Sequence, residues 1–216
     1  MAATSISDRQ RILEIIAAIT TGLGKLLFMN FLDWKLFFLI TATLGWGVYI
    51  IYRYKKTDGI LKYWGFRTDN FKKVLLKLLP FGILVIASSV IIGYFRETID
   101  LNWHIIPILI IYPIWGIIQH FLMMGLLAGN LQDLRSRDLN KITIIVITAT
   151  LFALVHYPYY LLILATFILA LFYAYIYLND RNIYVLGLVH GWLGGIFFYT
   201  VVGRDPFLEI FEKFIQ

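Results

Sequence analysis

One stretch of the sequence decides the fold: residues 103–131 read WHIIPILIIYPIWGIIQHFLMMGLLAGNL. These 29 residues contain no Asp, Glu, Lys or Arg. A helix needs about 20 mostly apolar residues to cross the hydrocarbon core of a bilayer. The stretch therefore predicts a transmembrane helix, and the polar side chains in its interior, Gln119 and His120, are expected to lie within the membrane.

Other apolar stretches come close enough to this length to be predicted as spans: residues 34–52, 78–95, 142–157, 160–178 and 183–202. Residues 12–28 are a further candidate, but Gly22-Leu23-Gly24-Lys25 could break them into an interfacial amphipathic piece. Both readings of residues 12–28 are left open. The predicted fold is an all-α, polytopic transmembrane helical bundle of about six to eight spans.

The composition points the same way. Hydrophobic residues make up 60% of the 216 residues, charged residues 15%, and the mean hydropathy is +0.78. Soluble domains are typically about 45–50% apolar and about 25% charged. The net charge of +6 comes mostly from short loops between apolar runs, which argues against nucleic acid as a partner. The absence of cysteine excludes disulfides, thiol nucleophiles and cysteine-bound metals.

The basic loops predict the orientation. Lys and Arg are concentrated in residues 53–77 and again in residues 132–141, whereas residues 96–102 carry one Arg against Glu97 and Asp100. Because cytoplasmic loops are enriched in Lys and Arg, both basic loops are expected in the cytoplasm and the C-terminus outside, in a plasma (inner) membrane. We expect one structural domain with three regions: N-terminal helices (1–102), a core (103–202) and an amphipathic tail (203–216).

Four polar side chains within the predicted spans are the candidate functional residues: Gln119, His120, His156 and His190. At about 1.5 Å of rise per residue, Gln119, His156 and His190 lie at estimated depths of about 11–22 Å. Ionisable groups in lipid usually face a bundle interior, so these residues could share one buried cavity. The alternative is that each histidine bonds a nearby carbonyl. Gly187, Gly191 and Gly195 form a face on which another helix can pack closely.

These positions resemble motifs of the CAAX-protease-like (CPBP, or ABI) membrane protein family. The family's Phe-x-x-x-His motif is intact as Phe152 to His156, and its His-x-x-x-Asn/Asp motif is half intact, with His190 followed by Gly194. Its Glu-Glu-x-x-x-Arg motif aligns with Gln119-His120 and Met124, so that both glutamates and the arginine are replaced. The resemblance covers about residues 103–202 and implies a CAAX prenyl protease-like core.

The resemblance implies chemistry that this sequence does not fully support. In active family members a glutamate and the histidine of the second motif activate water for peptide hydrolysis, and the last histidine and its Asn stabilise the oxyanion. Gln119 cannot accept a proton as a general base. Gly194 has no side-chain donor, and the loss of one such donor typically costs about 2.7–4 kcal/mol of transition-state stabilisation.

Three functional hypotheses follow. The first is a divergent intramembrane peptidase with His156 or His120 as base, His190 and Gln119 as donors, and a membrane or lipid-modified peptide as substrate. The second is a metal-dependent membrane enzyme with a divalent metal held by His120, His156 and His190, because imidazole is the commonest metal-binding side chain. The third is a pseudoenzyme that binds a partner protein, a peptide or a lipid in the cavity.

Overall fold

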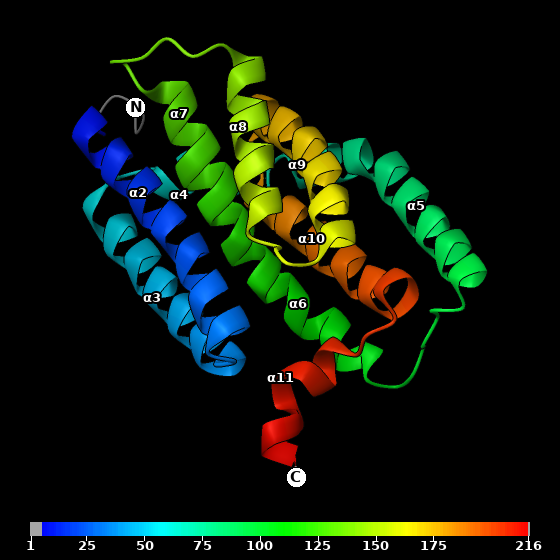
Figure 1. Ribbon diagram of the computed structural model, residues 1–216. Coiled ribbons are helices and arrows are strands. Elements are labelled where there is room, and N and C mark those ends of the chain that lie inside the picture. Colours follow the sequence, from blue (N-terminus) through cyan, green and yellow to red (C-terminus); the bar gives the residue numbers. More distant parts are fainter. Residues whose placement is uncertain (1–5, 216) are drawn as a thin grey trace.

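The computed structural model describes residues 6–215, with side chains through residue 212, and this part of the chain is a helical bundle without strands (Figure 1). Six helices are long and apolar enough to cross a membrane. They are α2 with η1 (Asp8–Lys25, Leu26–Phe31), α3 (Lys35–Lys56), α5 (Phe71–Arg96), α6 with η2 and α7 (Ile105–His120, Phe121–Ala128, Gly129–Asp133), α9 (Tyr160–Asp180), and α10 with η3 (Ile183–Phe197, Phe198–Val202). The predicted all-α, polytopic bundle is confirmed.

The first apolar stretch forms one of these six helices. Residues Asp8–Phe31 are helical throughout, and the run from Gly22 to Lys25 does not interrupt them. The helix begins at Ser7, whose hydroxyl accepts a hydrogen bond from the backbone N–H of Gln10 at 3.3 Å, the usual role of an N-cap serine. Of the two readings left open for residues 12–28, the long helix is the one observed.

The stretch 142–157, which was expected to span, forms a shorter helix than the others. Helix α8 (Lys141–Leu154) has 14 residues, which at about 1.5 Å per residue cover about 21 Å, against a hydrocarbon core of about 30 Å. Pro158 restricts the residue before it to extended conformations, so the helix cannot continue to Pro158. The chain turns back through residues 155–159 into α9, and this turn lies partway along the bundle rather than at its end (Figure 1).

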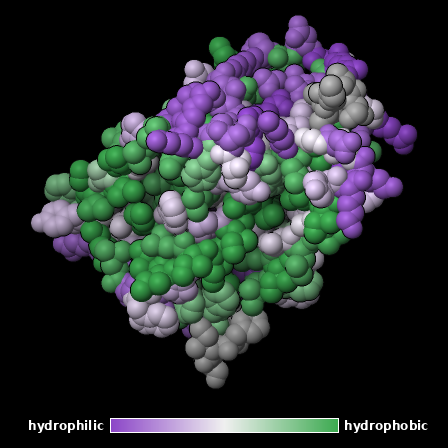
Figure 2. Space-filling model, turned by 180° about the vertical axis from the view of Figure 1, so that it is seen from behind, coloured by the Kyte–Doolittle hydropathy of each residue, from purple (hydrophilic) through white to green (hydrophobic). Residues whose placement is uncertain are grey.

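The two ends of the bundle differ in polarity. We call "basic end" the end that holds residues 57–70, 134–140 and 181–182. Hydrophilic side chains gather at one end of the face in Figure 2, and a broad hydrophobic band lies below them. Asp8 accepts hydrogen bonds from the backbone N–H groups of Arg135 and Ser136, so the start of α2 lies at the basic end. Helix α11 (Pro206–Ile215) lies at the opposite end (Figure 1). That the basic end faces the cytoplasm stays a prediction.

Charged side chains are buried where α2 and α3 join the rest of the bundle. Arg11, Glu14 and Arg53 are 1%, 4% and 2% exposed. Glu14 pairs with Arg53 and accepts a hydrogen bond from Asn130 Nδ2 at 2.7 Å. Arg11 Nη1 donates to Asn130 Oδ1 at 3.2 Å. Because each charge meets a partner, the burial cost is offset and the network ties the N-terminal helices to α7.

Helices α6 and α10 cross in close contact. A Cβ added at Gly187 would lie 2.4 Å from Ile117 Cα, and one at Gly191 would lie 2.5 Å from Pro113 N. Gly116 faces this contact from α6, because a Cβ there would lie 2.4 Å from Gly187 O. The backbones touch, as predicted for the small-residue face of residues 187 and 191.

Pro113 lies inside α6, and α10 compensates for the hydrogen bond that it removes. A proline in a helix cannot donate to the carbonyl four residues earlier, which here is Leu109. Trp192 Nε1 of α10 donates to Leu109 O at 3.1 Å. In lipid such a carbonyl must be satisfied by a neighbour, and the same helix that packs against α6 supplies the donor.

We predict that Gly187→Ala and Gly191→Ala each destabilise the protein by about 1–3 kcal/mol or more, because a methyl group would overlap backbone atoms of α6. Gly194→Ala is the matched control on the same helix, since a Cβ there meets nothing within 4 Å. Thermal unfolding in detergent measures the effect. Equal midpoints for Gly187→Ala and Gly194→Ala would show that the close α6–α10 contact does not support the fold.

Candidate functional site

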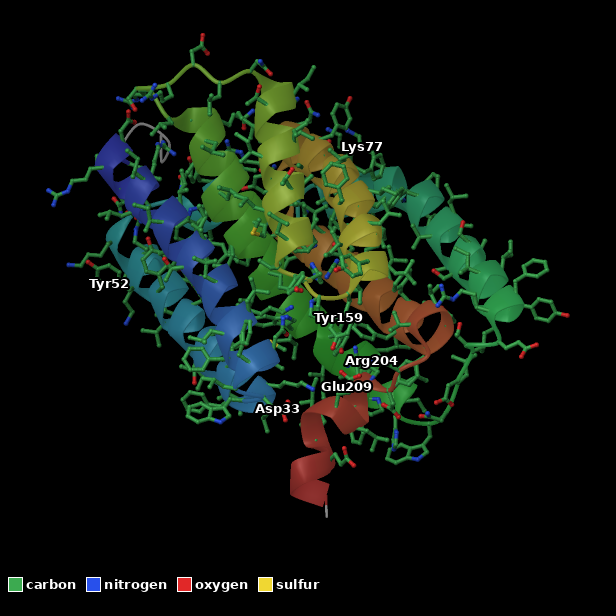
Figure 3. All side chains as sticks on the ribbon, viewed as in Figure 1. Asp33, Tyr52, Lys77, Tyr159, Arg204 and Glu209 are labelled. Carbon is green, nitrogen blue, oxygen red and sulfur yellow. The ribbon has the colours of Figure 1, made fainter. Side chains whose placement is uncertain are left out.

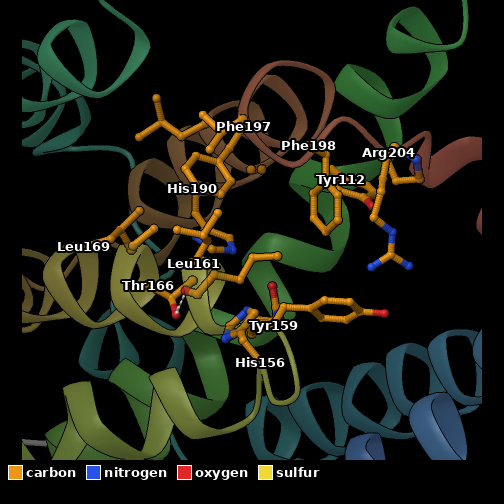
Figure 4. Close-up of a pocket in the computed structure, with 18 of the residues that line it drawn as sticks. Tyr112, His156, Tyr159, Leu161, Thr166, Leu169, His190, Phe197, Phe198 and Arg204 are labelled. Atoms are coloured by element: carbon orange, nitrogen blue, oxygen red, sulfur yellow. Dashed lines mark hydrogen bonds between the residues drawn. The ribbon is translucent and has the colours of Figure 1, made fainter. Parts of the chain in front are cut away.

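A cavity of about 710 Å³ lies in the half of the bundle away from the basic end. Its wall includes residues of η1, α5, α6, the 155–159 turn, α9 and α10, and residues in the first half of α11 also line it. The shortness of α8 creates this space, because the turn after α8 ends within the bundle and its residues His156, Pro158 and Tyr159 line the cavity. Figure 4 shows His156 and His190 on this wall.

His156 follows the last turn of α8. Its Nδ1 lies 2.8 Å from the carbonyl oxygen of Phe152. A carbonyl only accepts hydrogen bonds, so Nδ1 carries the proton and Nε2 is left with a lone pair. The contact is the carbonyl bond that the sequence left open as an alternative. It also fixes the tautomer in which His156 can accept a proton.

His190 and Gln119 line the same cavity, from α10 and α6 respectively. The close α6–α10 packing brings them to one wall. The Nδ1 atom of His190 is buried and has no hydrogen-bond partner among the described residues. The prediction that Gln119, His156 and His190 share a buried cavity agrees with this arrangement, whereas their catalytic roles stay predictions.

His120 lies behind this wall and does not line the cavity. Its side chain is fully buried, and neither ring nitrogen has a hydrogen-bond partner in the described part of the chain. The ring centroid lies 4.9 Å from that of His190 and 5.1 Å from that of Tyr173. One step along a helix rotates a side chain by about 100°, which explains why Gln119 faces the cavity and His120 does not.

Phe152 packs against all three histidines. Its ring centroid lies 5.5 Å from His120, 5.2 Å from His156 and 5.5 Å from His190. Phe152 and His156 are four residues apart and therefore lie on one face of the chain. The spacing of the Phe-x-x-x-His motif thus has a physical reason here: the phenylalanine fixes the positions of the imidazoles and supplies the carbonyl that orients His156.

Gly194 also lines the cavity, one turn after His190. Nothing lies within 4 Å of a Cβ built at this position. Where the resembling family carries Asn or Asp, this chain therefore has open space beside His190 and no side-chain donor.

Charged and polar side chains gather where the cavity meets α11. Figure 3 shows Asp33, Tyr159, Arg204 and Glu209 at this end of the bundle, and all four line the cavity. Arg204 pairs with Glu209 and lies 4.4 Å above the ring of Tyr159. Burial alone would lower the pKa of Arg204, but its hydrogen bond with Tyr159 and the charge of Glu209 raise it.

A second carboxylate anchors the turn before α11. Asp205 Oδ2 lies 2.5 Å from Nδ1 of His104, and Asp205 Oδ1 accepts a hydrogen bond from Tyr199 at 2.8 Å. Burial would raise the pKa of Asp205, but the hydrogen bonds with His104 and Tyr199 lower it. His104 thus holds the turn before α11 to the start of α6.

Among the cavity-lining residues that sequence reasoning missed, Lys25 is the one for which the sequence carried a signal. Its Nζ donates a hydrogen bond to the carbonyl oxygen of Val155. A lysine within an otherwise apolar helix was a usable signal, because ionisable side chains at this depth usually face partners. The other charged residues that line the cavity lie near helix ends, where nothing in the sequence distinguishes them from ordinary interface residues.

Among the residues with described side chains, no three His, Asp or Glu groups are arranged to hold a metal ion. His120 and His190 are in ring contact, and Phe152 lies against both of them and against His156. The structure therefore adds no geometric support to the hypothesis of a metal held by His120, His156 and His190.

Comparison with known proteins identifies the middle and later part of the chain. Residues 100–196 match the family described as Type II CAAX prenyl endopeptidase Rce1-like. No curated protein and no solved structure matches the chain. The matched segment contains Gln119, His120, His156, His190 and Gly194, the positions on which the resemblance was based. The resemblance to the CAAX-protease-like family is therefore confirmed for residues 100–196 of this multi-pass membrane protein.

Proposed function

We propose that the protein is a divergent intramembrane peptidase that hydrolyses a membrane or lipid-modified peptide at His156. The observation that carries this proposal is the placement of His156, His190 and Gln119 on one wall of a cavity within the bundle. The site thus combines a proton acceptor, polar groups for a carbonyl oxygen and an apolar enclosure.

His156 is the general base in this proposal. Its Nδ1–H is held by Phe152 O, so Nε2 accepts the proton of a water molecule while the water oxygen attacks the peptide carbonyl carbon. When the C–N bond breaks, the imidazolium returns that proton to the leaving amine. His120 is not used, because it does not line the cavity.

His190 and Gln119 stabilise the negative charge that develops on the carbonyl oxygen. A ring N–H of His190 and the amide N–H of Gln119 are both donors on the cavity wall. Hydrogen-bond donors in a site that excludes water contribute more than they do in water. With Gly194 in place of a third donor, we expect slow turnover.

The shape of the cavity supports a membrane-bound substrate. Leu84 and Val85 of α5 and Leu164 and Ile168 of α9 line it, and Leu84, Leu164 and Ile168 are 63%, 59% and 50% exposed. In a bilayer these exposed side chains face lipid, so the cavity is continuous with the membrane between α5 and α9. A substrate with an apolar chain or helix reaches it without leaving the membrane.

The second candidate is a pseudoenzyme that binds such a peptide without cleaving it. Two positions of the cavity wall favour it. Position 194 is a glycine beside open space, position 119 is a glutamine, and neither of them supplies a carboxylate to the cavity. A wild-type protein that binds a peptide but never cleaves it would favour this candidate.

We predict that His156→Ala lowers kcat/KM for a farnesylated, internally quenched peptide by about 10²–10⁴-fold, because a positioned general base typically contributes that much. Fluorescence release from the peptide in proteoliposomes measures the rate. His104→Asn is the matched control, since it changes a histidine outside the cavity and keeps a donor for Asp205. Unchanged turnover in His156→Ala would remove His156 from the mechanism.

We further predict that Gly194→Asn raises kcat/KM by about 10²-fold or more. The change adds an oxyanion donor beside His190 and Gln119, and removal of one such donor typically costs about 10²–10³ in kcat. Asn fits because nothing lies within 4 Å of a Cβ at position 194. Gly194→Ala is the control without the donor. Equal rates in both variants, each with a wild-type melting temperature, would contradict the proposed place of the oxyanion.

A further inference from the structure

Lys25 differs from the other charged groups of the cavity wall in its partners. Lys35 pairs with Asp33 at 3.4 Å, and Arg204 pairs with Glu209. Lys25 instead donates to one carbonyl oxygen, that of Val155, and no described carboxylate forms an ion pair with it. The lining of the cavity therefore carries one cation more than its carboxylates match.

The position of Lys25 makes this excess charge significant. It is the last residue of α2, which starts at the basic end, so it lies about 26 Å along the helix from Asp8. That depth is within the membrane, near the opposite interface. An ammonium group has three N–H donors, and the Val155 carbonyl takes one of them. A cation in an apolar environment is costly unless an opposite charge meets it.

The cavity is itself amphipathic. The charged residues that line it, Lys25 and Arg204 among them, come from outside α5 and α9, while α5 and α9 contribute mostly apolar side chains. Its volume of about 710 Å³ falls within the range of about 300–1,000 Å³ usual for small-molecule sites. An occupant that matches both parts has a polar head near Lys25 and an apolar chain beside α5 and α9.

From these observations we propose that the cavity binds a single-chain lipid with an anionic head, and that Lys25 pairs with that head. A carboxylate and a phosphate both satisfy the chemistry of the site. Lys25 lies outside residues 100–196, so this residue belongs to the part of the chain that the family comparison does not cover. Binding at Lys25 does not require hydrolysis and is tested separately from it.

The contact with Val155 gives Lys25 a competing structural role. Val155 follows the last residue of α8, and a cation near the C-terminal end of a helix is stabilised by the helix dipole. This contact explains one donor of the ammonium group. A purely structural Lys25 would affect stability equally with and without a lipid, whereas a lipid-binding Lys25 discriminates between charged and neutral heads.

The test uses the quenching of tryptophan fluorescence by bromine. Trp115 lines the cavity, so a brominated chain inside it quenches this residue, and Trp115→Phe gives the background from the other tryptophans. The full-length protein in a neutral detergent is titrated with 9,10-dibromostearate, with the matching dibrominated lysophosphatidate, and with dibromostearate methyl ester as the neutral control. All titrations are repeated in the background of His156→Ala.

We expect the wild type to bind at least one of the two acids more tightly than the ester. Lys25→Met weakens binding of that acid by about tenfold or more and leaves binding of the ester unchanged, while Lys25→Arg retains the preference. Loss for only one acid identifies the head group. Equal binding of acids and ester by the wild type, or an unchanged preference in Lys25→Met, would overturn the proposal. If Lys25→Met does not fold, the test rests on the wild type and Lys25→Arg, which both keep the positive charge. Both should then bind the acid more tightly than the ester.

Discussion

The contact of α6 with α10 through Gly116, Gly187 and Gly191 is the constraint on which the site depends. Apolar helices gain no hydrophobic free energy from meeting each other in lipid, so packing and hydrogen bonds must hold them. Backbone contact at Gly187 and Gly191, and the bond from Trp192 to the carbonyl freed by Pro113, supply both. The same contact sets His190 against the face of α6 that carries His120, and on the cavity wall that Gln119 shares. A side chain at Gly187 or Gly191 would push α10 away from α6 and so separate His190 from Gln119 and His120.

A second constraint is the length of α8. A helix of 14 residues cannot reach the far side of the bilayer, so its end has to be accommodated inside the bundle. The carbonyls freed there are met by Lys25 and by Asn30, whose Nδ2 lies 2.5 Å from Tyr157 O. The N-terminal helix therefore completes a site whose catalytic candidates all lie in the later part of the chain. This explains how a turn of irregular backbone persists at a depth where lipid offers no hydrogen bonds.

Much of this architecture followed from the sequence, because hydrophobic length and loop charge report directly on the bilayer. The spans, the place of the basic loops and the small-residue face at residues 187 and 191 were predictable for that reason. The short α8 was not, since residues 142–157 are as apolar as a true span and only Pro158 signals the end. Nor was the burial of Arg11, Glu14 and Arg53, because their pairing depends on contacts between residues far apart in sequence. Which way His120 faces also required the structure.

The cavity wall differs from the family's catalytic motifs at two positions, Gln119 and Gly194. Phe152 contacts both His156 and His190, which line one cavity and are the base and a donor of the proposed mechanism. At Gln119 the side chain is nearly the size of glutamate, so the change removes a proton acceptor without altering the wall. At Gly194 it leaves space that no neighbour has filled. The open space beside Gly194 leaves room in the cavity for an occupant, and the charge of Lys25 on its wall is what the proposed anionic head would meet.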